Sequence, residues 1–263
     1  MALQAKHVGA LKPLLLICFG TAINMWVIWL LPLDKLPFHG IWPVIVFRLV
    51  ATSSTLVLMR VFCPTSLTRI SFRLNRSRAL ASLAIVAFIL LPSLVHAPLG
   101  ESGISIVTQG LFFALWIGID EEIFSRGFVF GVLEKYGIGV AAILSSVHFG
   151  LLHAGNYLWG GQSFSYTLAQ VLNAASFGYL CAGLMIFTGS IWIPILLHGL
   201  SDFPMQLQTA AQYTHQVTGD PSWIPTIMQS LFMVMVGWAL LRVKSGRLES
   251  FLLPRLRQFG LVD

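Results

Sequence analysis

The sequence predicts an all-α, polytopic membrane protein of about eight transmembrane helices, forming one integral membrane domain over residues 1–263. Of these residues, 56% are hydrophobic and only 10% are charged, whereas a soluble domain carries roughly 25% charged residues. Several apolar runs reach about 20 residues, which is the length that crosses a hydrocarbon core of roughly 30 Å as a helix. The sequence shows no alternation of apolar and polar residues of the kind found in membrane β-barrels.

Eight apolar stretches along the chain define the expected helices. The first resembles a signal peptide at its start, but it continues through Leu33 and lacks a small-residue cleavage site, which favours a retained helix. After the third stretch, residues 97–110 contain proline and glycine, so we expect an external loop there. The predicted spans are residues 13–33, 41–62, 79–95, 111–133, 137–153, 164–187, 191–205 and 223–243.

Basic residues predict the orientation, because cytoplasmic loops of membrane proteins carry an excess of lysine and arginine. They collect near both ends of the chain and between the second and third spans. An even number of spans returns both termini to one side, so we expect a multi-pass protein of a bacterial inner (plasma) membrane with both termini cytoplasmic. This placement also accounts for the net charge of +6 without a nucleic-acid partner. The basic residues are Lys6, Lys12, Arg69, Arg73, Arg76, Arg78, Arg242, Lys244, Arg247, Arg255 and Arg257.

The fourth predicted span contains the acidic cluster Asp120-Glu121-Glu122 followed by Arg126. Charge at bilayer depth costs at least a few kcal/mol per residue, so such residues are by default functional candidates. Because residues i and i+4 share a helix face, Glu122 and Arg126 can form an ion pair, while Glu121 points toward Ser125 and stays free for chemistry. The alternative is a cytoplasmic helix end where charges meet lipid headgroups. Asp120 has no assigned role.

Histidines mark two later spans. His148 and His153 are offset by about 140° on a helix, so they do not enter one site together, and we interpret His148 as a hydrogen-bonded core residue. Taken alone, His153 fits an interfacial position. His198 and Asp202 share a helix face, where the carboxylate can orient the imidazole or the pair can lock helix packing. A rise of 1.5 Å per residue places Glu121, His153, His198 and Asp202 in the middle and outer part of the bilayer, which favours one common site.

Three short motifs follow one another along these spans: EExxxR at Glu121–Arg126, FxxxH at Phe149–His153 and HxxxD at His198–Asp202. In this order they resemble the motifs of the CPBP intramembrane proteases, a family that includes CAAX prenyl-protein endopeptidases and bacteriocin-processing or Abi-type enzymes. The resemblance covers roughly residues 111–205, which would hold the catalytic helices. It implies an intramembrane endopeptidase that hydrolyses a membrane-anchored protein or peptide, such as one with a sorting tail, a leader or a CAAX-like end.

The resemblance also implies roles for individual residues. Glu121 and His153 would activate a water molecule that attacks the scissile carbonyl, and Glu122 and Arg126 would hold Glu121 in position. A buried general base and buried hydrogen-bond donors suit this chemistry, since they act more strongly in a low-dielectric site. By hydropathy alone, Arg48 in the second span is expected to snorkel to the membrane interface rather than bind a substrate carboxylate.

In the same scheme, His198 and Asp202 would stabilise the oxyanion or orient its donor. Family members with asparagine at the last position have an amide donor, which an ionised Asp202 lacks. We favour a mechanism without a metal cofactor, but two imidazoles and two carboxylates also form an acceptable zinc set. That set would be Glu121, His153, His198 and Asp202.

Two other functions remain open from the sequence. A proton-coupled transporter would use the same buried residues as a relay, but it predicts polar residues on several further helices and often an internal repeat, and we find neither. A proteolytically silent membrane scaffold would keep the polar residues as a packing network.

Overall fold

The computed structural model describes residues 2–30, 42–71, 76–95, 103–210 and 220–244, and these residues are almost entirely helical, with no strand among them. The predicted all-α fold is confirmed. The long helices are α1 (Ala2–Leu30), α2 (Trp42–Phe62), α3 (Arg76–Val95), α4 (Ile104–Glu122), α6 (Ile138–Leu152), α8 (Phe164–Thr188), α9 (Trp192–Ala210) and α10 (Trp223–Lys244). The short ones are η2 (Pro64–Ile70), η4 (Ile123–Val129), α5 (Phe130–Leu133), η5 (Glu134–Tyr136) and α7 (Gly155–Leu158).

Each predicted span contains a helix, but the count of about eight membrane spans is not confirmed. Two apolar helical stretches, Leu11–Met25 and Ser77–Leu91, are shorter than the usual crossing length. In α9, the polar residues His198 and Asp202 interrupt the apolar sequence. Among the described residues, five stretches are long and apolar enough to cross a membrane: Ile45–Phe62, Ile104–Tyr136, Ile138–Leu158, Phe164–Thr188 and Trp223–Val243.

Two helix boundaries differ from the predicted ones. Helix α4 begins at Ile104, inside the expected external loop, and α9 continues past its expected end at residue 205 to Ala210. The two extensions pack on each other: Ile106 and Val107 contact an apolar cluster that contains Leu207. Burial of these apolar side chains stabilises helix where the loop residues alone predicted none. Arg73, Arg247, Arg255 and Arg257 lie outside the described residues, so the membrane orientation stays a prediction.

The α4–α9 pair forms the centre of the bundle, and glycines allow its close approach. A Cβ atom on Gly118 would lie 2.8 Å from the carbonyl oxygen of Ile195, and one on Gly199 would lie 2.8 Å from the Cα of Leu115. Gly110 faces Leu207 farther along, so the two helices run antiparallel. Small residues of this kind let helix backbones approach in membrane proteins. The contact brings the acidic end of α4 against His198.

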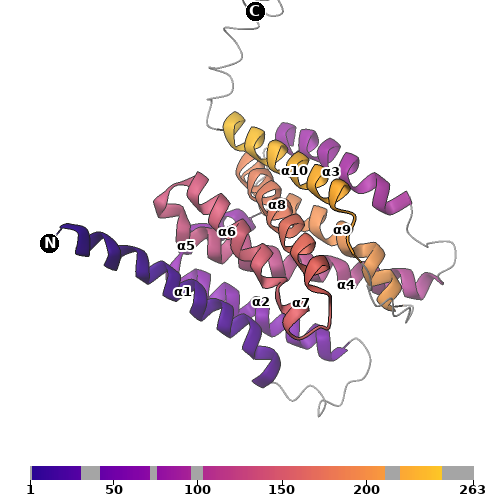
Figure 1. The fold of residues 1–263 in the computed structure, drawn as a ribbon, viewed down its shortest axis with the longest axis horizontal. Coiled ribbons are helices and arrows are strands. Elements are labelled where there is room, and N and C mark those ends of the chain that lie inside the picture. Colours follow the sequence, from indigo (N-terminus) through magenta and orange to yellow (C-terminus); the bar gives the residue numbers. More distant parts are fainter. Residues whose placement is uncertain (1, 31–41, 72–75, 96–102, 211–219, 245–263) are drawn as a thin grey trace, which may run out of the picture.

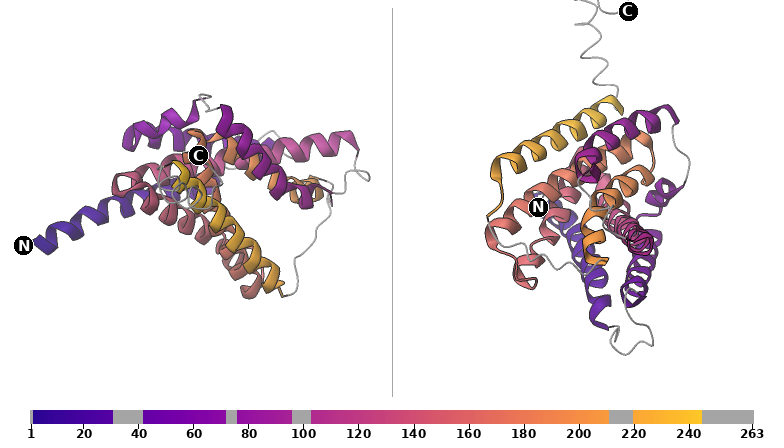
Figure 2. Two further views of the ribbon diagram at one scale, coloured as in Figure 1. Left: turned by 90° about the horizontal axis from the view of Figure 1, so that it is seen from above. Right: turned by 90° about the vertical axis from the view of Figure 1, so that its right-hand side faces the viewer.

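The other helices surround this pair on two flanks. Helices α1 and α2 lie side by side on one flank, and α3 and α10 lie on the opposite one (Figures 1 and 2). Helix α8 packs extensively on both α10 and α6. The α4–α9 pair therefore lies between these two flanks (Figures 1 and 2).

The acidic cluster ends at a π-helical segment, η4, which directly follows Glu122. Every residue from Ile123 to Phe130 is buried. Helix α2 approaches closely, because a Cβ on Gly127 would lie 2.7 Å from the Sδ atom of Met59. Single π turns inside helices are rare and often occur at functional sites.

Three connections meet at one end of the bundle, as alternating spans require. Arg69 in η2 forms an ion pair with Glu134 in η5. The backbone N–H of Ile191 donates to the carbonyl of Arg69 at 3.0 Å, and the indole N–H of Trp192 donates to the carbonyl of Ile70 at 2.8 Å. The segments after α2, after α5 and before α9 therefore lie together.

The glycine contact can be tested by adding one methyl group. Gly118→Ala should lower the free energy of unfolding by about 1–3 kcal/mol, because the new Cβ overlaps the α9 backbone. Gly139→Ala is the matched control, since a Cβ there meets nothing within 4 Å. Thermal or denaturant unfolding of the purified protein in detergent measures both. Equal stability of the two variants would show that the close approach is not required.

Candidate active site

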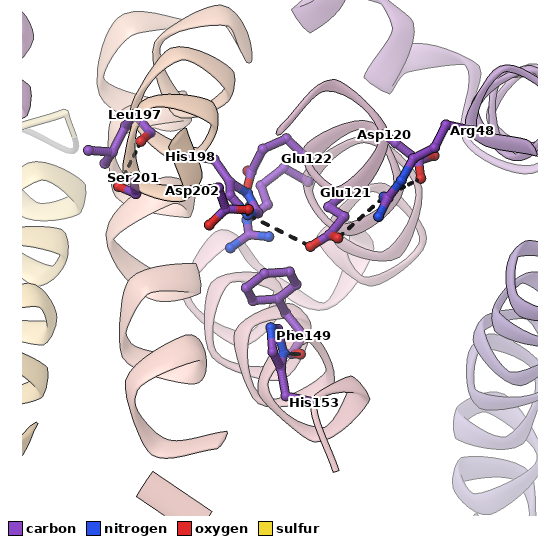
Figure 3. A network of polar contacts seen from close by, with 11 residues as sticks. Arg48, Asp120, Glu121, Glu122, Phe149, His153, Leu197, His198, Ser201 and Asp202 are labelled. Carbon is purple, nitrogen blue, oxygen red and sulfur yellow. Dashed lines mark hydrogen bonds and ion pairs between the residues drawn. The ribbon is translucent and has the colours of Figure 1, made fainter. Parts of the chain in front are cut away.

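A cavity of about 370 Å³ lies between α1, α2, α4, α6, α8 and α9, and its wall contains all four residues predicted to carry the chemistry. Figure 3 shows these residues converging from three helices. The lining is partly apolar, with Met25, Phe47, Ile117, Leu152 and Met205. The four predicted residues are Glu121, His153, His198 and Asp202.

Glu122 lies behind the cavity wall and connects two helices. One of its oxygens, Oε1, is 2.8 Å from Nδ1 of His198, and the other, Oε2, is 3.1 Å from Nε of Arg126. Glu122 and Arg126 are fully buried. The predicted i,i+4 ion pair is confirmed. A carboxylate only accepts hydrogen bonds, so Glu122 holds the proton of His198 on Nδ1 and directs Nε2 into the cavity.

Glu121 faces the cavity, and it has two partners there that the sequence did not predict. Its Oε1 accepts a hydrogen bond from Nη1 of Arg48 at 3.3 Å, and its Oε2 lies 3.7 Å from Nε2 of His198. Its side chain is 30% exposed, in contrast to the fully buried Glu122. Glu121 is thus the acid of the pair that a substrate or a water molecule can reach.

Arg48 and Asp120 were missed as site residues. Arg48 does not snorkel to the interface, since its Nη1 donates to Oδ2 of Asp120 at 2.9 Å as well as to Glu121. Thr52 donates to the other oxygen of Asp120 at 3.0 Å. A signal was present in the sequence, because a lone arginine within an apolar span needs a partner. Asp120 therefore anchors Arg48, and Arg48 holds one oxygen of Glu121.

His153 lies at the C-terminal end of α6, with its Nδ1 3.1 Å from the carbonyl oxygen of Phe149. The carbonyl can only accept, so Nδ1 donates and Nε2 is left for other partners. The Phe149 ring contacts both site histidines edge-on, with centroid distances of 5.1 Å to His153 and 5.7 Å to His198. Among the described residues, no hydrogen bond or ion pair joins His153 to Glu121. Both residues instead line the same cavity (Figure 3).

Asp202 lies one turn beyond His198 on α9, with Oδ2 3.7 Å from Nε2 of the imidazole. The predicted i,i+4 pairing is present, although the distance exceeds that of a hydrogen bond. Nε2 of His198 therefore lies between two carboxylates, those of Glu121 and Asp202.

The metal alternative requires at least three donors around one point. Among the residues that the structure describes, no group of three His, Cys, Asp or Glu side chains is arranged to hold an ion. The ligand set Glu121, His153, His198 and Asp202 shares a cavity but not this geometry. We therefore derive no step through a metal ion.

Two further residues complete the polar interior. The guanidinium of Arg126 lies 4.6 Å from the centroid of Phe149, a cation–π contact. Its nitrogens have no hydrogen-bond partner among the described residues, so the Glu122 charge is its main compensation. His148 is a hydrogen-bonded interior histidine, as predicted, with Nε2 2.9 Å from Oγ1 of Thr21.

Residues 103–204 match the family model described as type II CAAX prenyl endopeptidase Rce1-like. This segment is an Rce1-like domain. The resemblance to CPBP and CAAX proteases that the three motifs indicated is confirmed, and the Rce1-like domain contains all four predicted site residues. The domain is less than half of the chain. Comparisons with curated proteins and with solved structures found no match. The match supports a membrane protease in general.

Arg126 is predicted to matter for stability because its removal leaves Glu122 as an uncompensated buried charge. Arg126→Leu should destabilise the protein by about 3–5 kcal/mol. The double variant Arg126→Leu/Glu122→Gln should recover part of this loss, since it removes the charge as well. Unfolding of both variants in detergent measures the difference. A double variant as unstable as the single one would show that the ion pair is not the cause.

Proposed function

We propose that the protein is an intramembrane endopeptidase that hydrolyses a peptide bond in a membrane-anchored substrate. The observation that carries the proposal is the placement of Glu121. It is a partly exposed carboxylate, held between Arg48 and His198, on the wall of a cavity enclosed by apolar helices. A fixed carboxylate that meets water in such a site is suited to act as a general base. The Rce1-like match supports the same reaction class.

In the proposed reaction, Glu121 takes a proton from a water molecule, and the oxygen of that water attacks the scissile carbonyl carbon. His153 lines the same cavity with Nε2 available, so it accepts a second hydrogen bond from the water. When the carbon–nitrogen bond breaks, the proton held by Glu121 passes to the leaving amine. One water molecule is consumed, and one carboxyl and one amino end are formed.

His198 is proposed to stabilise the oxyanion. As an imidazolium it donates from both ring nitrogens, from Nδ1 to Glu122 and from Nε2 to the developing negative charge. Asp202 lies 3.7 Å from the same Nε2 and orients the ring. Glu122 and Arg126 were expected to hold Glu121. The geometry supports a different role for them, because Glu122 contacts His198 rather than its neighbour.

The substrate is proposed to be a protein or peptide with a membrane-anchored segment, such as a sorting tail, a leader or a CAAX-like end. The cavity is lined by apolar as well as charged side chains. Apolar side chains suit a membrane-anchored segment, and the charged ones would meet the peptide bond.

Glu121→Gln tests the general base. Cleavage should fall by about 10²–10⁴-fold, the range for loss of a general base, while stability stays close to wild type. Comparative membrane peptidomics of cells carrying each form should reveal intact anchored precursors only in the variant. Glu134→Gln is the control, because this glutamate pairs with Arg69 at the bundle end. Identical peptide sets for wild type and Glu121→Gln would favour a silent scaffold.

Metal dependence is tested separately on the purified protein. We propose a mechanism without a metal ion. Prolonged chelator treatment should therefore leave the rate of precursor cleavage within about twofold of the untreated rate. Removal of a catalytic metal ion would lower the rate far more. Elemental analysis of the active protein provides the second measurement. Loss of activity on chelation, with recovery on adding zinc, would overturn the metal-free mechanism.

A further inference from the structure

A second cavity, of about 270 Å³, adjoins the site. It shares lining residues with the first cavity, so the same imidazoles and carboxylate border both spaces. A peptide bond attacked at this wall would have one side of the substrate in each cavity. The shared residues are Phe149, His153, Gln170, His198 and Asp202.

The second cavity lacks most of the charged side chains of the first. Side-chain amides line both cavities, but Arg48, Asp120 and Glu121 line only the first. The amides of the second are those of Gln170, Asn173 and Gln229. The Nδ2 of Asn173 on α8 donates to Oε1 of Gln229 on α10 at 3.2 Å. Apart from Asp202, no acidic or basic side chain other than histidine lines it among the described residues.

These amides lie where a membrane helix normally presents apolar side chains. Asn173 is about 14 Å from the start of α8 at 1.5 Å per residue, within a candidate membrane span. Gln229 is exposed on α10, between apolar residues that face outward. Polar side chains at such depth are expensive and mark substrate paths.

We propose that this amide-lined cavity is a subsite that hydrogen-bonds the main chain of the substrate on one side of the scissile bond. An extended peptide that enters this cavity displaces water, so its N–H and C=O groups need hydrogen-bond partners from the protein. A side-chain amide offers both a donor and an acceptor, as a neighbouring peptide strand does. Recognition of the main chain also accommodates different side-chain sequences. The proposal rests on the proposed endopeptidase function.

The first experiment measures whether the cavity is open to water, independently of proteolysis. Single cysteines at Asn173 and Gln229, in a Cys18→Ala background, are treated with a charged methanethiosulfonate in permeabilised membranes. Leu172→Cys and Met228→Cys are the matched controls, because these neighbours point outward from the same helices. Labelling at 173 and 229 should be about tenfold faster or more, since the reagent reacts with the hydrated thiolate. Equal rates at all four positions would overturn the proposal.

The second experiment uses, as substrate, the precursor that accumulates with Glu121→Gln. The double variant Asn173→Leu/Gln229→Leu should lower kcat/KM by about tenfold, mainly through KM, because two hydrogen bonds to the peptide are lost. Gln109→Leu is the control: this exposed amide is bonded to Ser105 on α4 and lines neither cavity.

The outcomes separate the two hypotheses. Unchanged kcat/KM in the double variant, with cleavage by the wild type intact, would overturn the subsite but leave the endopeptidase function standing. A lower melting temperature combined with normal cleavage by the folded fraction would also overturn it, and would assign the amide pair to helix packing. If no precursor depends on Glu121, the proposed function fails, and the subsite fails with it.

Discussion

The close approach of α4 and α9 at Gly118 and Gly199 is the constraint on which the site depends. Glu122 follows Gly118 by one helical turn, and His198 directly precedes Gly199, so the glycines set the distance between acid and imidazole. Larger side chains would move the backbones apart, and a hydrogen bond of 2.8 Å does not survive such a shift. The α4–α9 contact therefore both packs the bundle and sets the geometry of the Glu122–His198 pair.

Solvent exposure of the charged side chains increases along the series from Arg126 to Glu121. Arg126 and Glu122 are fully buried, His198 is nearly so, and Glu121 is partly exposed. Each charged group has an opposite charge beside it, which limits the cost of burying it in a low-dielectric interior. On the other side, Arg48 and Asp120 hold Glu121 from α2 and α4. The carboxylate proposed to act on water is thus the one that its neighbours position without enclosing it.

Helical spacing and residue depth predicted much of the site from sequence. The Glu122–Arg126 pair and the His198–Asp202 pair followed from the i,i+4 rule, because both partners lie on one helix. The contact between Glu122 and His198 and the role of Arg48 depend on which helices pack together, and the sequence alone does not give that register. The count of about eight membrane spans stays a prediction, because among the described residues five stretches reach crossing length and other apolar helices are shorter or interrupted by polar residues.

The π-helical segment has a consequence for how the protein meets lipid. A transmembrane helix usually shows at least one side to the acyl chains, but from Ile123 to Phe130 this one shows none. The segment that carries Arg126 is therefore surrounded by protein. The ion pair of Arg126 and Glu122 is shielded from the hydrocarbon, and the bilayer need not thin or admit water to accommodate this pair.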